Sequence, residues 1–257
     1  MKDKIVFITG AASGIGLEMG KSFARNGARV VLSDVDEQKV VAVAAALQTQ
    51  GLMTEGLGCD VTREEQLGQA IAHTHQQYGR LDVLINNAGL QYISPVDEFP
   101  ADKFELLIKV MLVAPFLAIK HAFPIMKQQQ WGRIINMASV NGLVGFSGKA
   151  AYNSAKHGVI GLTKVAALEG AAHGITVNAV CPGYVDTPLV QNQLAGIARL
   201  RKIPVEKVLE EVIYPLVPQR RLLDVQEIAA YVMYLAGDDA RGITGQAVVI
   251  DGGYTAQ

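Results

Sequence analysis

Short apolar runs alternate with longer helical patterns along most of this chain. Short runs rich in Val, Ile and Leu are typical of buried strands, and longer segments with apolar residues three and four positions apart are typical of helices. The pattern predicts helices near residues 15–26, 36–50, 63–78, 101–127, 150–172 and 224–237. It predicts strands at Ile5–Thr9, Arg29–Ser33, Thr54–Cys59, Val83–Asn86, Arg133–Met137, Thr176–Val180 and Ala247–Ile250.

This alternation predicts an α/β fold of the Rossmann type, with a doubly wound, mostly parallel sheet of about seven strands covered by helices on both faces. Right-handed crossovers then bring the carboxyl ends of the strands to one edge. We expect one domain over residues 1–257. The alternation fails between Thr187 and about Val217, where prolines punctuate two helix-like pieces. So long an excursion favours a substrate lid, with a structural arm as the alternative.

Composition excludes some classes of partner. The chain has 257 residues, 18% of them charged, and a formal net charge of −1, which gives no electrostatic reason to expect nucleic acid or an anionic membrane. Cys59 and Cys181 lie far apart without a CxxC motif and are expected to be buried thiols in a reducing compartment. No signal peptide is expected, and charge or glycine interrupts the long apolar runs. These features predict a cytoplasmic protein.

A glycine-rich turn follows the first strand and precedes a helical pattern. Glycines spaced as in Gly10, Gly14 and Gly16 permit a tight turn and close approach of the backbone to a pyrophosphate, which the helix N-terminus attracts. The lysine of a P-loop is missing. Nucleotide binding is favoured over a purely structural turn. The turn contributes Gly10, Ser13, Gly14, Ile15 and Gly16 to the expected cofactor site.

Other expected cofactor residues end the next strands. Asp34, 18 residues beyond Gly16, suits a hydrogen-bonded ribose diol and repels a 2′-phosphate, so NAD is expected rather than NADP. Asp60 and Val61 close the third strand at the expected adenine edge, although Asp60 would serve equally well as a helix N-cap. The turn that follows the fourth strand supplies the expected floor of the site, formed by Asn87, Ala88 and Gly89.

Candidate acid–base chemistry lies at Tyr152 and Lys156, four residues apart on one helix face. A tyrosine has an ordinary pKa near ~10, and a nearby ammonium favours its phenolate. We therefore expect Lys156 to lower the pKa of Tyr152 into the working range of a general base. Ser139, which follows the fifth strand, can hydrogen-bond a substrate oxygen.

The segments TGAASGIG, NNAG, YNSAK and PGYVDT, with Ser139, resemble the short-chain dehydrogenase/reductase family over essentially the whole chain. The resemblance implies that Tyr152 is the general acid or base, that Lys156 also binds the nicotinamide ribose, and that Ser139 holds the carbonyl oxygen. Met111 stands where the family has an asparagine that anchors a water of the proton relay, and a thioether cannot replace its hydrogen bonds. The segment that holds the nicotinamide amide in the family corresponds to Pro182, Gly183, Val185 and Thr187.

Further segments, including NNAGLQ, AKHG, TPLV and DGGYTA, resemble bacterial 3-hydroxybutyrate dehydrogenases. In those enzymes two glutamines and a lysine bind the substrate carboxylate, and the matching residues are Gln91, Lys149 and Gln193. Asn141 and Tyr184 depart from the His and Trp of those enzymes and change the shape of the expected pocket. A solvated loop lysine is the alternative for Lys149. The expected substrate set is Gln91, Ser139, Asn141, Lys149, Tyr152, Tyr184 and Gln193.

The resemblance thus implies NAD-dependent exchange between (R)-3-hydroxybutyrate and acetoacetate, in a homotetramer that binds a small hydroxy acid. Alternatives are another NAD-linked alcohol, sugar or hydroxysteroid dehydrogenase, a 3-oxoacyl carrier-protein reductase, or a non-catalytic nucleotide-binding scaffold. No metal site is expected, because the histidines have no carboxylate or cysteine company.

Overall fold

The computed structural model describes residues 1–256 and contains one seven-stranded sheet in which every neighbouring pair of strands is parallel. The strand order is β3-β2-β1-β4-β5-β6-β7, which confirms the predicted fold class. The order reverses direction between β1 and β4, and such switch points open a crevice at the carboxyl edge. The strands are β1 (Ile5–Thr9), β2 (Arg29–Asp34), β3 (Thr54–Gly58), β4 (Val83–Asn86), β5 (Gly132–Met137), β6 (Ile175–Pro182) and β7 (Ala247–Ile250).

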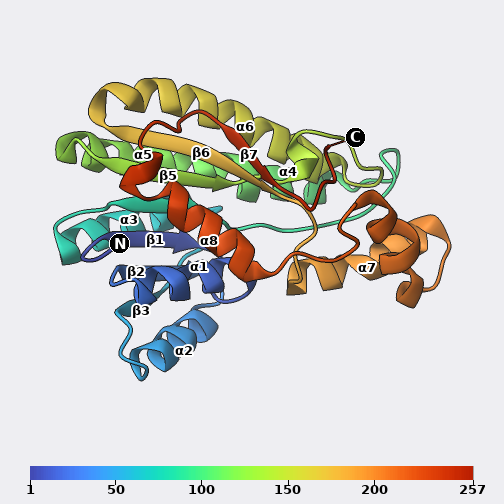
Figure 1. Cartoon of the computed structure of the whole chain (residues 1–257), viewed down its shortest axis with the longest axis horizontal. Helices are drawn as coiled ribbons and strands as arrows, with labels where there is room; N and C mark the ends of the chain where they lie inside the picture. The colour runs from blue at the N-terminus through green and yellow to red at the C-terminus, as the bar shows by residue number, and fades with distance from the viewer. Residues whose placement is uncertain (257) are drawn as a thin grey trace.

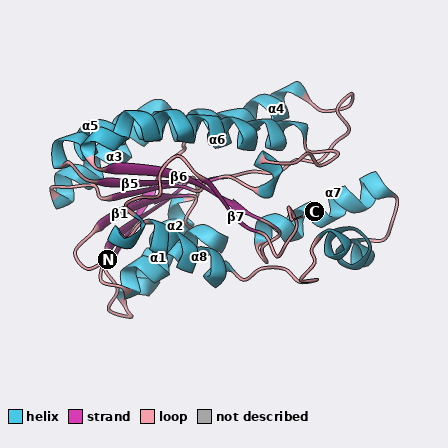
Figure 2. Cartoon of the chain, turned by 45° about the horizontal axis from the view of Figure 1, so that its top comes forward, coloured by secondary structure: helices cyan, strands magenta, loops and turns pink. Residues whose placement is uncertain are grey.

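Helices cover both faces of this sheet, as Figure 2 shows. One hydrophobic cluster packs α1 (Gly14–Arg25), α2 (Glu37–Gln48) and α8 (Val225–Leu235) on one face. A second cluster packs the other face beneath α3 (Glu64–Tyr78), α4 (Ala101–Ile108), α5 (Ala114–Gln129) and α6 (Ala150–Gly170). Burial between two helical layers explains why the central strands β1 and β4 read as nearly unbroken apolar runs, whereas the edge strands β3 and β7 are only partly buried.

The helix predicted over residues 101–127 is not regular throughout. A π-helical turn at Lys109–Val113 separates α4 from α5, and Met111 within it is buried. By length and composition alone, Ala101–Gln129 is apolar enough to cross a membrane, despite the charges that were expected to interrupt such runs. Just over half of its most apolar window is buried against the rest of the protein, as in a helix of a soluble core.

The segment between residues 187 and 217 extends beyond the carboxyl edge of the sheet (Figure 1). It begins with α7 (Pro188–Arg201), which Thr187 caps by accepting a hydrogen bond from the Val190 amide at 3.2 Å. Proline at the first helical position fits, because its missing N–H would have no helical partner there. Apolar side chains of this segment, with Tyr184, form a hydrophobic cluster separate from the two that cover the sheet.

The amino edge of the sheet is held by a buried carboxylate. Asp82, which is fully buried, accepts a hydrogen bond from the Ile5 amide at 2.9 Å and two from the Arg80 guanidinium at 2.8 and 2.6 Å. The Lys4 ammonium lies 3.5 Å from the same carboxylate. Lys4 also lies over the Trp131 ring. These contacts tie the starts of β1, β4 and β5 together at the edge opposite the crevice.

Replacing Asp82 by alanine is expected to lower the free energy of unfolding by about 2–4 kcal/mol, because the Ile5 amide and two cations lose their shared acceptor. Chemical denaturation measures this change. Lys103→Ala, which removes an exposed ion pair with Asp102, is the control and should leave stability unchanged. An equal, small effect of both variants would contradict an anchoring role for Asp82.

Candidate active site

Three adjoining cavities lie along the carboxyl edge of the sheet. Their volumes are about 510, 100 and 50 Å³. The largest begins at the glycine-rich turn, the middle one contains Ser139, Tyr152 and Lys156, and the smallest contains Lys149. Leu189 lines all three, so they form one continuous crevice.

All but one of the residues predicted for the cofactor line this crevice. Gly16 is the exception, because it lies beneath the turn, where an added Cβ would come within 2.5 Å of both Asn87 Nδ2 and the Gly10 oxygen. The predicted cofactor residues that line the two larger cavities are Gly10, Ser13, Gly14, Ile15, Asp34, Asp60, Val61, Asn87, Ala88, Gly89, Tyr152, Lys156, Pro182, Gly183, Val185 and Thr187.

The glycine-rich turn has the geometry of an anion cradle. Gly10 and Gly14 have φ angles of +64° and +56°, which favour glycine. A Cβ on Gly10 would lie 2.7 Å from the Ala88 Cα, whereas a Cβ on Gly14 would make an ordinary contact with Thr187 at 3.7 Å. Ser13 precedes α1 in an extended conformation and its side chain makes no capping hydrogen bond. The first amides of α1 are therefore free to bind a pyrophosphate.

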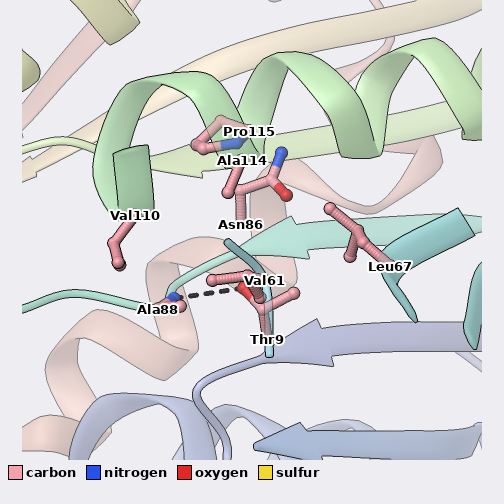
Figure 3. Close-up of a pocket in the computed structure, with 8 residues that line it drawn as sticks. All are labelled: Thr9, Val61, Leu67, Asn86, Ala88, Val110, Ala114 and Pro115. Carbon is pink, nitrogen blue, oxygen red and sulfur yellow. Dashed lines mark hydrogen bonds between the residues drawn. The ribbon is translucent and has the colours of Figure 1, made fainter. Parts of the chain in front are cut away.

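Asn87 and Thr9 hold the floor of the crevice against this turn. Asn87 Nδ2 donates to the Thr9 and Gly10 carbonyl oxygens at 3.0 and 2.9 Å. Thr9 Oγ1 accepts hydrogen bonds from the amides of Asn87 and Ala88. Thr9 and Ala88 line a small cavity, whose volume is about 10 Å³. Figure 3 shows Thr9 and Ala88 on its lower side and Val110, from the π-helical turn, above them. The sequence did not point to Thr9, although it is the polar residue that ends β1.

Two carboxylates mark the outer end of the crevice. Asp34 accepts hydrogen bonds from the amides of Ala12 and Asp36, at 3.0 and 3.2 Å, so its position is fixed relative to the glycine-rich turn. Asp60 Oδ1 accepts from the Thr62 amide and hydroxyl, and Arg63 rather than Asp60 is the N-cap of α3. Among the described residues, the lining of the large cavity contains Asp34 and Asp60 but no lysine or arginine.

The acid–base residues meet where β5 ends and α6 begins. Ser139 follows β5, and its Oγ accepts a hydrogen bond from the Asn141 amide at 3.1 Å. Lys156 is buried, its Nζ donates to the Met137 carbonyl oxygen, and it lies 5.5 Å from the centre of the Tyr152 ring. The two side chains thus share one helix face and one cavity, as their spacing predicts.

The expectation that Lys156 lowers the pKa of Tyr152 is not met in this structure. Burial raises the pKa of the Tyr152 phenol, and a hydrogen bond with Ser139 only partly opposes this effect. Burial also lowers the pKa of Lys156 to about 8. Burial thus shifts both pKa values toward the neutral form, because desolvation penalises charge. The Lys156 Nζ is directed to the Met137 carbonyl oxygen rather than to the phenol.

The cavity of about 50 Å³ is lined by every residue predicted for the substrate. Lys149 is 2% exposed, and no carboxylate within residues 1–256 forms an ion pair with it. Burial lowers the pKa of this ammonium to about 7. Gln91 and Gln193 are joined across the cavity at 3.5 Å. The predicted residues that line it are Gln91, Ser139, Asn141, Lys149, Tyr152, Tyr184 and Gln193.

Aromatic rings surround Lys149, which excludes the solvated loop lysine. Its Nζ lies 4.6, 5.3 and 5.9 Å from the ring centres of Phe146, Tyr184 and Tyr152. Ring faces attract a cation, but they leave its hydrogen-bonding capacity free. The cavity therefore presents a desolvated cation and several amides, a combination that suits a small carboxylate.

Sequence reasoning missed several apolar residues of the crevice. Leu189 is the most central, and the signal for it is its place after Thr187-Pro188 at the start of α7. Met111 lies beside the floor, with its Sδ 3.7 Å from the position of a Cβ on Gly89. In the part of the chain that the structure describes, no cluster of three or more His, Cys, Asp or Glu side chains is arranged for a metal.

Comparison with known proteins places this crevice in context. A family model described as enoyl-(acyl carrier protein) reductase matches residues 10–255. An uncharacterised oxidoreductase of Bacillus subtilis is 60% identical over the full length of both chains. A D-beta-hydroxybutyrate dehydrogenase of Rhizobium meliloti is 42% identical over 99% of both chains, and one of Cupriavidus necator is 36% identical over all of both.

Among solved structures, an actinorhodin polyketide ketoreductase variant with NADPH has a TM-score of 0.95 at 32% identity, with both chains fully covered. Full-length coverage in sequence and in structure leaves no part of the described fold unmatched. The chain therefore belongs to the short-chain dehydrogenase/reductase family of oxidoreductases.

Proposed function

We propose that the protein is an NAD-dependent dehydrogenase of a small hydroxy acid, with (R)-3-hydroxybutyrate and acetoacetate as the favoured pair. The observation that carries this proposal is the buried Lys149 ammonium, which shares a cavity with Ser139 and Tyr152 and has no carboxylate partner among residues 1–256. A substrate carboxylate supplies the missing charge. Relatives named D-beta-hydroxybutyrate dehydrogenases support the choice of acid.

Members of this family bind a nicotinamide cofactor, and the crevice fits one. The free amides of α1 suit the pyrophosphate, and Asp34 suits the adenosine ribose. Pro182, Gly183, Val185 and Thr187 line the inner part, where a nicotinamide would lie. Asp34, in a lining without lysine or arginine, supports NAD as the cofactor.

In the proposed reaction the side chains of the protein transfer the hydroxyl proton. A bound nicotinamide supplies the acceptor or the donor of the hydride. Ser139 holds the reacting oxygen, and Tyr152 takes the hydroxyl proton during oxidation or returns it during reduction. Lys156 must turn its ammonium from the Met137 carbonyl toward the phenol to stabilise the phenolate. Lys149, with Gln91 and Gln193, fixes the carboxylate so that the alcohol faces Ser139 and Tyr152.

The size of the substrate cavity separates this proposal from the alternatives. A volume of about 50 Å³ around Lys149 favours a small substrate over a steroid or a long acyl chain. We propose residues 187–217 as the lid, because Leu189, Val190 and Gln193 of α7 already form one wall. An uncharged alcohol or sugar substrate would offer no carboxylate to the buried Lys149 ammonium.

We further propose a homotetramer in the cytoplasm, with the whole chain as one domain. The outer face of α6 supports association, because Val165 and Leu168 are 54% and 81% exposed and Gly161 has open space beside it. Both cysteines are free, as in a reducing compartment. Light scattering on the purified protein tests the assembly, and a monomeric mass would exclude it.

The direct experiment mixes the purified protein with NAD and (R)-3-hydroxybutyrate and follows reduced-nicotinamide absorbance. Turnover with a polyol but not with this acid would reject the substrate and keep the reaction class. Tyr152→Phe should lose nearly all turnover and still bind cofactor. If neither protein reduces NAD with any small alcohol, a non-catalytic scaffold becomes the better proposal.

Cofactor choice is expected to depend on Asp34. Asp34→Ser should weaken NAD binding about tenfold or more and strengthen NADP binding, because a charged acceptor for the ribose diol and a repulsion of the 2′-phosphate both disappear. Fluorescence titration of each reduced cofactor measures both affinities. Asp60→Asn is the matched control and should change both affinities equally. Tighter binding of NADP than of NAD to the unmodified protein would refute the assignment.

Carboxylate binding is expected to depend on pH through Lys149. In the free site the ammonium is charged below its pKa of about 7 and neutral above it. Because a carboxylate binds the charged form, acetate should bind to the protein with NAD about tenfold more weakly for each pH unit above that pKa. Calorimetric titration from about pH 6 to about pH 9 measures this trend.

Lys149→Met should abolish that pH dependence and reduce kcat/KM for the hydroxy acid about 100-fold or more, with cofactor affinity unchanged. Acetate binding that is equally strong throughout this range in the unmodified protein would show that Lys149 does not bind the carboxylate.

A further inference from the structure

The Tyr184 hydroxyl is a buried polar group that no contact in the described structure accounts for. The side chain is 6% exposed and lines the substrate cavity. Its hydroxyl oxygen is buried and has no hydrogen-bond partner among residues 1–256. Buried hydroxyls are nearly always hydrogen-bonded, because desolvation without a partner is costly. A tyrosine retained at such a place indicates a partner that the protein itself does not supply.

The surrounding contacts hold this ring in place. The Tyr184 ring packs edge-on against the Tyr254 ring, with 6.3 Å between the ring centres. The Lys149 ammonium lies 5.3 Å from the centre of the Tyr184 ring. The backbone oxygen of Tyr184 accepts a hydrogen bond from the Leu223 amide at 2.8 Å. Burial raises the pKa of this phenol, so the hydroxyl remains a proton donor throughout the working range. The ring is therefore held in the wall of the cavity, and its buried hydroxyl is a donor without a partner among the described residues.

The other polar side chains of the cavity, apart from Asn141, already have roles under the proposed function. Lys149 faces the carboxylate, and Ser139 and Tyr152 face the reacting oxygen. Gln91 and Gln193 contact each other and flank the carboxylate. The hydroxyl of Tyr184 is left over, and 3-hydroxybutyrate itself has only a methyl group to offer beyond the two functions that these residues bind.

We propose that Tyr184 determines substrate specificity by donating a hydrogen bond to a further polar group, so that the preferred substrate is a short hydroxy acid with a second hydroxyl. This inference rests on the proposed function and refines it. A site that has a donor for a substrate hydroxyl discriminates against the analogue that lacks it, because the donor is then left unpaired.

The test compares kcat/KM, with NAD, for (R)-3-hydroxybutyrate, 3,4-dihydroxybutyrate and 2,3-dihydroxybutyrate. The unmodified protein should favour one of the two dihydroxy acids about tenfold or more. Tyr184→Phe should remove that preference by lowering kcat/KM for the favoured dihydroxy acid alone. Tyr254→Phe, the same change on the neighbouring ring outside the cavity lining, should preserve the preference.

The outcomes distinguish a failure of the role proposed for Tyr184 from a failure of the proposed function. Turnover of 3-hydroxybutyrate without any preference for a dihydroxy acid overturns the role of Tyr184 and keeps the proposed function. A preference that survives Tyr184→Phe, or an equal loss on all three acids, also overturns it. If none of these acids is oxidised, the proposed function fails as well. Tyr184→Phe should melt at the Tm of the unmodified protein, since the ring contacts remain, and this result excludes misfolding as the cause of any loss.

Discussion

The burial of two lysine ammonium groups without a carboxylate partner is the constraint on which the crevice depends. Lys149 and Lys156 are both buried, and no carboxylate in the described residues lies within ion-pair distance of either. Desolvation lowers the pKa of Lys149 to about 7 and that of Lys156 to about 8. An uncompensated buried charge is costly, so an anionic group that enters this space gains more than it would at the surface. Burial thus disfavours the charged form of both lysines and at the same time makes them selective for anionic groups.

The opposite edge of the sheet shows how the fold can sustain this cost. There the buried Asp82 carboxylate is satisfied by an amide and by the cations of Arg80 and Lys4. The two ends of the parallel strands therefore differ in whether their buried charges have ion-pair partners. The charge of Asp82 at the amino edge is paired within the chain and fastens the strands. At the carboxyl edge Asp60 pairs with Arg63, but the ammonium groups of Lys149 and Lys156 have no ion-pair partner among the described residues.

Much of this arrangement could be predicted from the sequence, since it follows from periodicity and spacing. Apolar runs located all seven strands, and glycine spacing located the cradle before α1. The spacing of Tyr152 and Lys156 placed both on one helix face. The π-helical turn at Lys109–Val113 escaped prediction, because the helical pattern of apolar residues continues through it, although Pro115 follows it closely. Leu189 escaped as well, because its contact with three cavities depends on how α7 folds back over the sheet edge.

The direction of the shift in the pKa of Tyr152 could not be predicted from residue spacing. Spacing shows that a cation is near a phenol, but the sign of the shift depends on whether Coulomb attraction exceeds desolvation. Here Lys156 directs its Nζ to the Met137 carbonyl, so desolvation dominates and the phenol holds its proton. The Lys156 Nζ nevertheless lies 5.5 Å from the centre of the Tyr152 ring, which is close enough for a charge to act on the phenol. The pKa of Tyr152 therefore reflects a balance between burial and nearby charge, and residue spacing alone does not give the sign of that balance.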